Sequence, residues 1–193
     1  MKAVLALAVC LLLPLSAAHA STIAYFANLL GSNEVPPTGS PATGFTLVTV
    51  DTTANTMHVQ VTFSGLEAGD TASHIHCCGP LGTNQIVATT TPTFPNFPSG
   101  VTSGTYDNTL DMTQASSYNP AFITAQGGTV ASAEAALFAG LAGGMAYLNI
   151  HSSMFPGGEI RGQLAAATPE PGTLLLAGVA LAGFALRRRR FSW

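Results

Sequence analysis

The sequence predicts an all-β domain, an antiparallel Greek-key sandwich with one short helix. Between Ser21 and Ala166, short segments of alternating apolar and polar residues are separated by Gly, Pro and Asn. The chain is rich in Thr, Gly and Pro and has only 8% charged residues, which is typical of an extracellular β protein. Strand connections this short favour a two-sheet sandwich or a Greek-key barrel.

The clearest strand runs from 57 to 63, where apolar and polar side chains alternate. We expect the core to include Met57, Val59, Val61, Phe63, Leu148 and Ile150. Further strands are expected at 45–50, 72–77, 85–90, 145–151 and 159–164. The Pro-rich segment 92–100 is expected to be an exposed loop. The one helix candidate is Ala133 to Leu141, which is rich in Ala and followed by Gly.

The first 20 residues have the form of a signal peptide that signal peptidase removes. An apolar run at 3–15 follows Lys2, and the small residues Ala18 and Ala20 precede the expected cleavage site before Ser21. A retained anchor is the alternative reading, but the apolar run is shorter than the roughly 20 residues that a membrane span requires.

The C-terminal segment, 167–193, predicts a membrane-linked tail. A Pro-Glu-Pro motif precedes an apolar run at 173–186, and four arginines follow it. The motif residues are Pro169, Glu170 and Pro171, and the basic cluster is Arg187, Arg188, Arg189 and Arg190. The run is short for a transmembrane helix, but flanking residues and local bilayer thinning can accommodate it. The positive-inside rule leaves the arginines cytoplasmic and the domain outside the membrane.

Between these two ends the charge is strongly acidic. Residues 21–168 contain eight acidic residues and one basic residue, Arg161, so their net charge is −7 with neutral histidines. A nucleic-acid partner is not expected, because such binding needs cations that neutralise phosphates. No Ser-His-Asp order, paired carboxylates or phosphate-binding Gly loop supports a hydrolase or kinase.

Three segments of the domain resemble the CHRD domain, the module named after chordin. Their sequences are GSNEVPP at 31–37, ASHIH at 72–76, and YLNIH followed by PGGEIRGQL within 147–164. The motif residues carried over are Glu34, Pro36, Pro37, Asn149, Gly158, Glu159, Arg161 and Gly162. The resemblance covers nearly all of 21–166 and implies a binding or matrix role without established enzymatic activity. Cys77 and Cys78 depart from the family pattern.

The C-terminal segment resembles the PEP-CTERM sorting tail. The resemblance implies that the inner membrane holds the tail until an exosortase cleaves it near 169–171. The protein would then move to the outer surface or the extracellular matrix. A permanent C-terminal anchor is the alternative reading of the same residues.

A shorter similarity connects the domain to Cu/Zn superoxide dismutase. A Gly-Leu turn at 65–66 is followed by His74-Ile75-His76, and this supports a Greek-key sandwich of the superoxide dismutase or immunoglobulin-like kind. The dinuclear copper and zinc site of that enzyme needs a bridging His and further ligands. No His occurs between His76 and His151, so we do not expect superoxide dismutation.

The histidines nevertheless define a candidate metal site. His74 and His76 are two apart on an expected strand, so both rings leave the same face and could reach one ion. The family pairing of the segments places His151 as a third ligand. Copper suits imidazole ligands best, and zinc fits nearly as well. Alternatively, the three rings are structural and bond to the backbone and to neighbouring Asn or Glu. In either case we expect the rings to converge at one end of the sandwich.

Two further pairs of residues have open roles. Cys77 and Cys78 remain after signal cleavage in an oxidising compartment. They could form a vicinal disulfide, an intermolecular bridge, or soft metal ligands beside His76. Glu159 and Arg161 share a strand face and are expected to form a structural ion pair, with each other or with a partner strand.

Two functions are therefore consistent with the sequence. The first is an exported, non-catalytic matrix or surface protein with an extracellular ligand that the sequence does not identify. The second is a mononuclear copper- or zinc-binding or redox protein that uses His74, His76 and His151.

Overall fold

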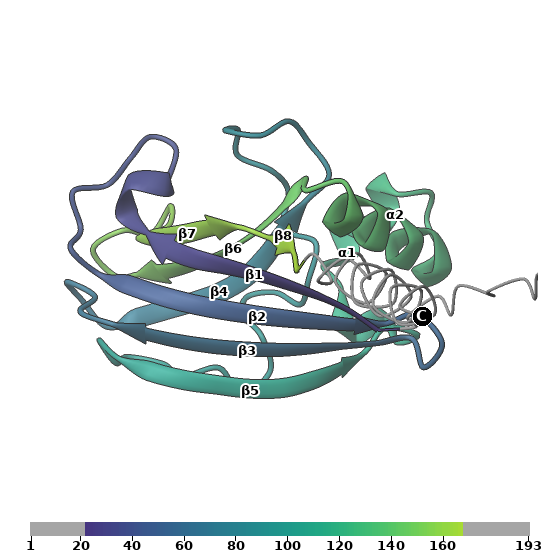
Figure 1. Ribbon diagram of the computed structural model, residues 1–193, viewed down its shortest axis with the longest axis horizontal. Coiled ribbons are helices and arrows are strands. Elements are labelled where there is room, and N and C mark those ends of the chain that lie inside the picture. The colour runs from purple at the N-terminus through teal and green to yellow at the C-terminus, as the bar shows by residue number, and fades with distance from the viewer. Residues whose placement is uncertain (1–21, 168–193) are drawn as a thin grey trace, which may run out of the picture.

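A computed structural model describes residues 22–167, which form one curled sheet of eight antiparallel strands with two α-helices (Figure 1). Across the sheet the strands follow the order β4-β6-β7-β1-β2-β3-β5, and β8 pairs with β1. The predicted signal peptide, 1–20, and the sorting tail from 169 onward lie outside the described residues. Within 22–167 no helix is both long and apolar enough to cross a membrane, and the predicted membrane helix, 173–186, is outside this range.

The elements have the following bounds. The strands are β1 (Thr22–Leu30), β2 (Thr43–Asp51), β3 (Thr56–Ser64), β4 (Asp70–Cys77), β5 (Gly104–Asp111), β6 (Ala146–Ser152), β7 (Ile160–Gln163) and β8 (Ala165–Ala166). The 3-10 helices are η1 (Gly31–Asn33) and η2 (Ala115–Ser117), and the α-helices are α1 (Pro120–Ala125) and α2 (Val130–Ala142).

Long strands in unbroken register form one half of the sheet. β1 pairs with β2 from Thr22↔Asp51 to Leu30↔Thr43, and β2 pairs with β3 over its full length. The inward positions on these strands are apolar, which puts the core against the inner face. The six predicted core residues are all at most 5% exposed: Met57, Val59, Val61, Phe63, Leu148 and Ile150.

The all-β prediction is confirmed, but the strands form one sheet instead of the two sheets of a sandwich. The chain returns to β1 near its end, where β7 pairs with β1 at Leu30↔Arg161 and β8 pairs with Tyr25 and Phe26. These contacts join β4, β6 and β7 to the long strands. The sheet therefore curls around its core as a half-barrel (Figure 1).

The predicted helix is confirmed as α2 and extends to Val130–Ala142. Thr129 caps its first turn, because its hydroxyl accepts from the main-chain nitrogen of Ser132. The structure adds a second helix, α1, which the sequence analysis did not predict. Asn119 caps α1, and Pro120 occupies its first position, which is a recognised start signal for a helix.

The segment 92–100 is a loop, as predicted, and most of its residues are exposed, but two of its aromatic side chains are not. Phe94 and Phe97 are buried, and their rings lie 5.6 Å and 5.1 Å from the ring of Tyr106 on β5. The nitrogen of Phe94 donates to the main-chain oxygen of Ser73 on β4 (3.0 Å). The segment therefore fills the space between the two edge strands of the curled sheet.

Four strand assignments differ from the prediction. Segment 85–90 forms only isolated bridges, at Val87 and Thr89. Strands β1, β5 and β8 were not predicted from the sequence. β1 (TIAYFANLL) is apolar on both faces and β5 (GTYDNTLD) is mostly polar, so neither has a strong alternating pattern.

Replacing Val61 with Asp should destabilise the fold severely. Val61 is buried in the middle of β3, so the substitution would bury a carboxylate without a partner. We expect a loss of about 3 kcal/mol or more in the free energy of unfolding, measured by denaturant titration. Thr62→Asp places the same charge on the exposed face of β3 and should change stability little. Equal stability of both variants would contradict the assignment of the inner face.

Candidate functional site

The predicted histidines lie on the outer face of β4 and β6. In this strand pair His74 is opposite Asn149, and His151 is opposite Ala72. Ile75, between the two β4 histidines, points into the core, so His74 and His76 leave the sheet on the other side. They are nevertheless only 6% and 8% exposed.

The three rings come together as predicted. One possible ligand atom from each of His74, His76 and His151 lies within 4.8 Å of the other two. The ring of His74 is 4.9 Å from the ring of His151 and 5.5 Å from the ring of His76, centroid to centroid. The cluster lies on the outer face of the β4–β6 pair, where His74 is opposite Asn149, His76 is opposite Tyr147 and His151 is opposite Ala72.

Each histidine uses one nitrogen to donate to the main chain. His74 donates from Nε2 to the oxygen of Pro92 (2.6 Å), and His76 from Nδ1 to the oxygen of Gln85 (2.7 Å). His151 donates from Nδ1 to the oxygen of Pro156 (2.9 Å). A carbonyl oxygen only accepts, so these nitrogens carry the protons and the second nitrogen of each neutral ring is an acceptor.

The second nitrogens lack donors. Nδ1 of His74 and Nε2 of His76 are buried without a well-formed hydrogen bond, and the side chain of Asn149 is the polar group beside both rings. Nε2 of His151 lies 3.1 Å from Oδ1 of Asn149, an oxygen that also only accepts. The site therefore gathers several acceptor atoms in one buried place, which is an arrangement that a cation or a proton would stabilise.

The surroundings hold the rings neutral. Burial, followed by the neighbouring His151 ring, lowers the pKa of His74 to about 4. Burial also lowers the pKa of His76 and of His151 below the ordinary value. All three imidazole rings are therefore neutral near pH 7, each with one N–H and one unprotonated nitrogen. The neutral form is the one that binds metal ions.

Asn149 connects the histidines to a buried ion pair. Its side chain hydrogen-bonds to Glu34 on one side and meets the histidine rings on the other. Nε of Arg161 lies 3.8 Å from Oε2 of Glu34, and the two side chains are 6% and 5% exposed. The guanidinium of Arg161 also lies 4.5 Å above the ring of Tyr147, which stacks on His76 at 4.7 Å.

Glu34 is the most perturbed acid of this group. Burial raises its pKa to about 7, although Arg161 and a hydrogen bond from Asn149 act in the opposite direction. Its Oε1 atom has no hydrogen-bond partner. Near neutral pH the carboxyl group is therefore partly protonated, and it compensates the charge of Arg161 incompletely.

Glycines of the motif give these side chains room. Gly158 has φ +124°, and a Cβ atom there would lie 2.6 Å from Oε1 of Glu34 and 2.8 Å from Nδ2 of Asn149. A Cβ atom at Gly162 would overlap the main-chain oxygen of Asn28 on β1. The motif prolines Pro36 and Pro37 are exposed in the loop that follows Glu34.

The expected ion pair between Glu159 and Arg161 is not formed. Glu159 is fully buried just before β7, and its Oε1 accepts from Ser40 Oγ (2.7 Å) and from the nitrogen of Glu67 (2.8 Å). It fixes two loops, while Arg161 pairs with Glu34. The pairing of Arg161 with Glu34 could not be predicted from the sequence, because most of the chain separates these two residues.

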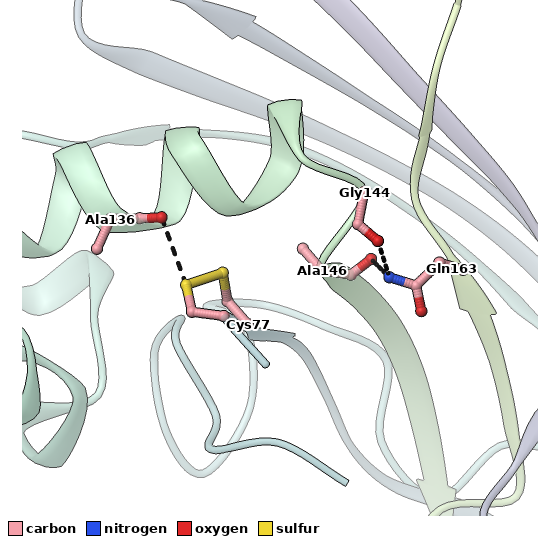
Figure 2. Close-up of a disulfide and its surroundings, with 6 residues drawn as sticks. Cys77, Ala136, Gly144, Ala146 and Gln163 are labelled. Atoms are coloured by element: carbon pink, nitrogen blue, oxygen red, sulfur yellow. Dashed lines mark hydrogen bonds between the residues drawn. A yellow bond between two sulfur atoms is a disulfide. The ribbon is translucent and has the colours of Figure 1, made fainter. Parts of the chain in front are cut away.

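Cys77 and Cys78 form a vicinal disulfide, which was one of the three expected options. Figure 2 shows this bridge beneath α2, with Sγ of Cys78 3.4 Å from the main-chain oxygen of Ala136. Cys77 is buried on the inner face, opposite to the face of His76, so soft metal ligation beside His76 is wrong. Nearby, Gln163 donates to the main-chain oxygen of Gly144 (2.6 Å; Figure 2).

Comparison with known families agrees with these motifs. The CHRD domain matches residues 25–164, which include every histidine and charged group of the site. The chain belongs to the CHRD domain family. The PEP-CTERM protein-sorting motif matches residues 167–190. Searches of curated proteins and of solved structures each gave no match.

The two matches together describe an exported protein that is sorted by its tail. The PEP-CTERM motif implies export, transient anchoring in the membrane and processing by an exosortase. The matched segment contains Pro169, Glu170, Pro171 and the cluster from Arg187 to Arg190, all outside the described residues. The CHRD family assignment does not identify a ligand, so the chemistry of the site has to come from its geometry.

Replacing Glu34 with Gln should change the pH dependence of stability. Between about pH 4.5 and 7 the native carboxyl binds a proton that the unfolded chain releases, so the parent loses stability as pH rises. The variant does not lose stability in this way. Between pH 4.5 and 7 its free energy of unfolding should rise by about 3 kcal/mol relative to that of the parent. The buried histidines are present in both proteins. The difference between their free energies of unfolding therefore reports the contribution of Glu34 alone.

The measurement is denaturant unfolding of both proteins at pH 4.5, 6 and 8. Glu67→Gln removes an exposed carboxyl and serves as the matched control. A parent-to-variant difference that stays constant with pH would show that the pKa of Glu34 is not raised.

Proposed function

We propose that this chain is an exported CHRD protein whose domain binds one copper or zinc ion through His74, His76 and His151. The observation that carries the proposal is the orientation of the rings. Each ring donates one N–H to a main-chain oxygen and has an unprotonated second nitrogen, and one possible ligand nitrogen from each ring lies within 4.8 Å of the other two. Metal-binding histidines are oriented in this way, with the second nitrogen donating to a carbonyl or carboxylate.

The distances require only a small closure around the ion. Zinc–nitrogen bonds of about 2.0–2.1 Å in a tetrahedral site put the ligand nitrogens roughly 3.3 Å apart. The candidate atoms lie within 4.8 Å of one another, so a shift of roughly 1 to 2 Å brings them to a common ion. Three imidazoles suit copper and zinc, and Oδ1 of Asn149 or a water is available for the remaining position.

A purely structural role accounts less well for the site. A hydrogen-bonded cluster should satisfy its buried nitrogens, yet His74 Nδ1 and His76 Nε2 make no well-formed hydrogen bond and have only the side chain of Asn149 nearby. Leaving a buried acceptor unpaired costs about 1 to 3 kcal/mol. A bound ion, or a water between the rings, removes this cost.

The sorting tail supports a binding role for this protein at the cell surface or in the extracellular matrix. After exosortase processing, we place the protein at the outer surface or in the extracellular matrix, where it acts as a non-catalytic binding protein. Sorting by the PEP-CTERM tail and the acidic composition of 21–168 support this part of the proposal.

The metal proposal is tested by titrating the exported protein with zinc and with copper, using calorimetry and elemental analysis after dialysis. The parent should bind one ion, and His74→Ala or His151→Ala should weaken binding at least tenfold. His58→Ala is the matched control, because His58 lies on β3, where it contacts Asp107 (2.7 Å) and not the cluster. A parent indifferent to both metals, with variants that lose only stability, would leave the cluster structural.

Processing at both ends is tested by intact-mass analysis of the protein recovered from outside the cell. The mature chain should begin at Ser21 and should lack the cluster from Arg187 to Arg190, because signal peptidase and exosortase cleave before them. Replacing Glu170 in the Pro-Glu-Pro motif with Ala should leave the cluster attached. A mature parent that retains the arginines would indicate a permanent anchor.

A further inference from the structure

A pocket of about 620 Å³ opens beside the ion pair, between η1 and the loop after β4. Its polar wall consists of Asn28, Ser32, Asn33, Glu34, Arg161 and Gln163. Its size is within the range of small-molecule sites. The predicted metal site does not include any of these residues, so the pocket is a separate feature.

Arg161 is the only Lys or Arg in the range 22–167. Its Nε donates to the main-chain oxygen of Asn33 (2.5 Å), and its Nη1 donates to Oδ1 of Asn84 (2.9 Å). These bonds hold the guanidinium in place at the pocket wall and leave Nη2 without a hydrogen-bond partner among the described residues. A guanidinium with a free edge is the side chain best suited to bind a carboxylate.

Glu34 does not occupy this free edge. Its nearer oxygen lies 3.8 Å from Nε of Arg161, which is longer than a hydrogen bond, and its other oxygen lies close to Gly158. The guanidinium edge of Arg161 therefore has no carboxylate within hydrogen-bond distance, and an incoming anion can take that place.

The rest of the wall offers groups for hydroxyls. The side chains of Asn28 and Ser32 are exposed and make no hydrogen bond within the described part of the chain. Gln163 uses its amide nitrogen for the main-chain oxygens of Gly144 and Ala146, which leaves its amide oxygen free to accept. Amide and hydroxyl groups of this kind pair with hydroxyl groups of a ligand.

We propose that this pocket binds a small carboxylate that also carries hydroxyl groups, with Arg161 holding the carboxylate and Asn28, Ser32 and Gln163 contacting the hydroxyls. The pocket is adjacent to the histidine cluster through Tyr147, but the proposal does not require a metal ion. It adds a ligand class to the binding role and can fail without affecting the metal proposal.

The test uses glucuronate and glucose as probes, titrated into the metal-free exported protein by calorimetry. Glucuronate should bind at least tenfold more tightly than glucose, because only glucuronate carries the charge that Arg161 recognises. Raising the salt concentration should weaken glucuronate binding. Equal binding of the two sugars, or no binding of glucuronate, would overturn the proposal.

Two variants locate the site. Ser32→Asp puts a negative charge on the exposed wall and should weaken glucuronate binding about tenfold or more without disturbing a hydrogen bond. Ser116→Asp makes the same change on an exposed residue of η2, outside the pocket, and should leave binding unchanged. Arg161→Gln should abolish binding, with its melting temperature measured in parallel because Arg161 also supports the fold. If Ser32→Asp binds like the parent, the ligand lies elsewhere.

Discussion

The structure depends on hydrogen bonds to polar side chains that are buried on the outer face of the sheet. The outer face of an antiparallel sheet is usually open to water, but here loops cover β4, β6 and β7. Each buried donor must then find an acceptor in those loops. The main-chain oxygens of Gln85, Pro92 and Pro156 accept from the three histidines, so the loops and the cluster position one another.

The same burial explains the electrostatics of the site. Burial raises the pKa of a carboxyl and lowers the pKa of an imidazole, because both changes favour the neutral form. Glu34 and the three histidines follow this rule. The cluster is therefore rich in acceptors and contains one cation, which leaves it suited to a metal ion on one side and to an anion on the other.

Local patterns could be predicted from the sequence, and long-range pairings could not. The alternation from Met57 to Phe63 identifies β3 and its buried face, and the spacing of His74 and His76 identifies a shared face. Their convergence with His151 required the family resemblance, because register between distant strands is not encoded in spacing. The contact of Asn33 with Arg161 joins residues separated by 128 positions, and no local signal indicates it.

The burial of Phe94 is a second long-range contact that could not be predicted from the sequence. Three prolines around it correctly exclude a strand, but composition does not show that the loop fills the space between β4 and β5. A half-barrel has two open edges, and something must cover the core between them. The aromatic residues of 92–100 do so, and Asp70 fixes the end of the segment by accepting from the nitrogen of Val101 (2.9 Å).

The position of His76 is determined from both faces of β4. On the outer face its ring stacks on Tyr147 and donates to Gln85. On the inner face the next residue, Cys77, packs against α2, where a Cβ atom at Gly140 would overlap its sulfur. Successive residues of a strand point to opposite faces. The contacts of Cys77 near α2 and of His76 with Tyr147 and Gln85 therefore hold the same end of β4 from its two sides.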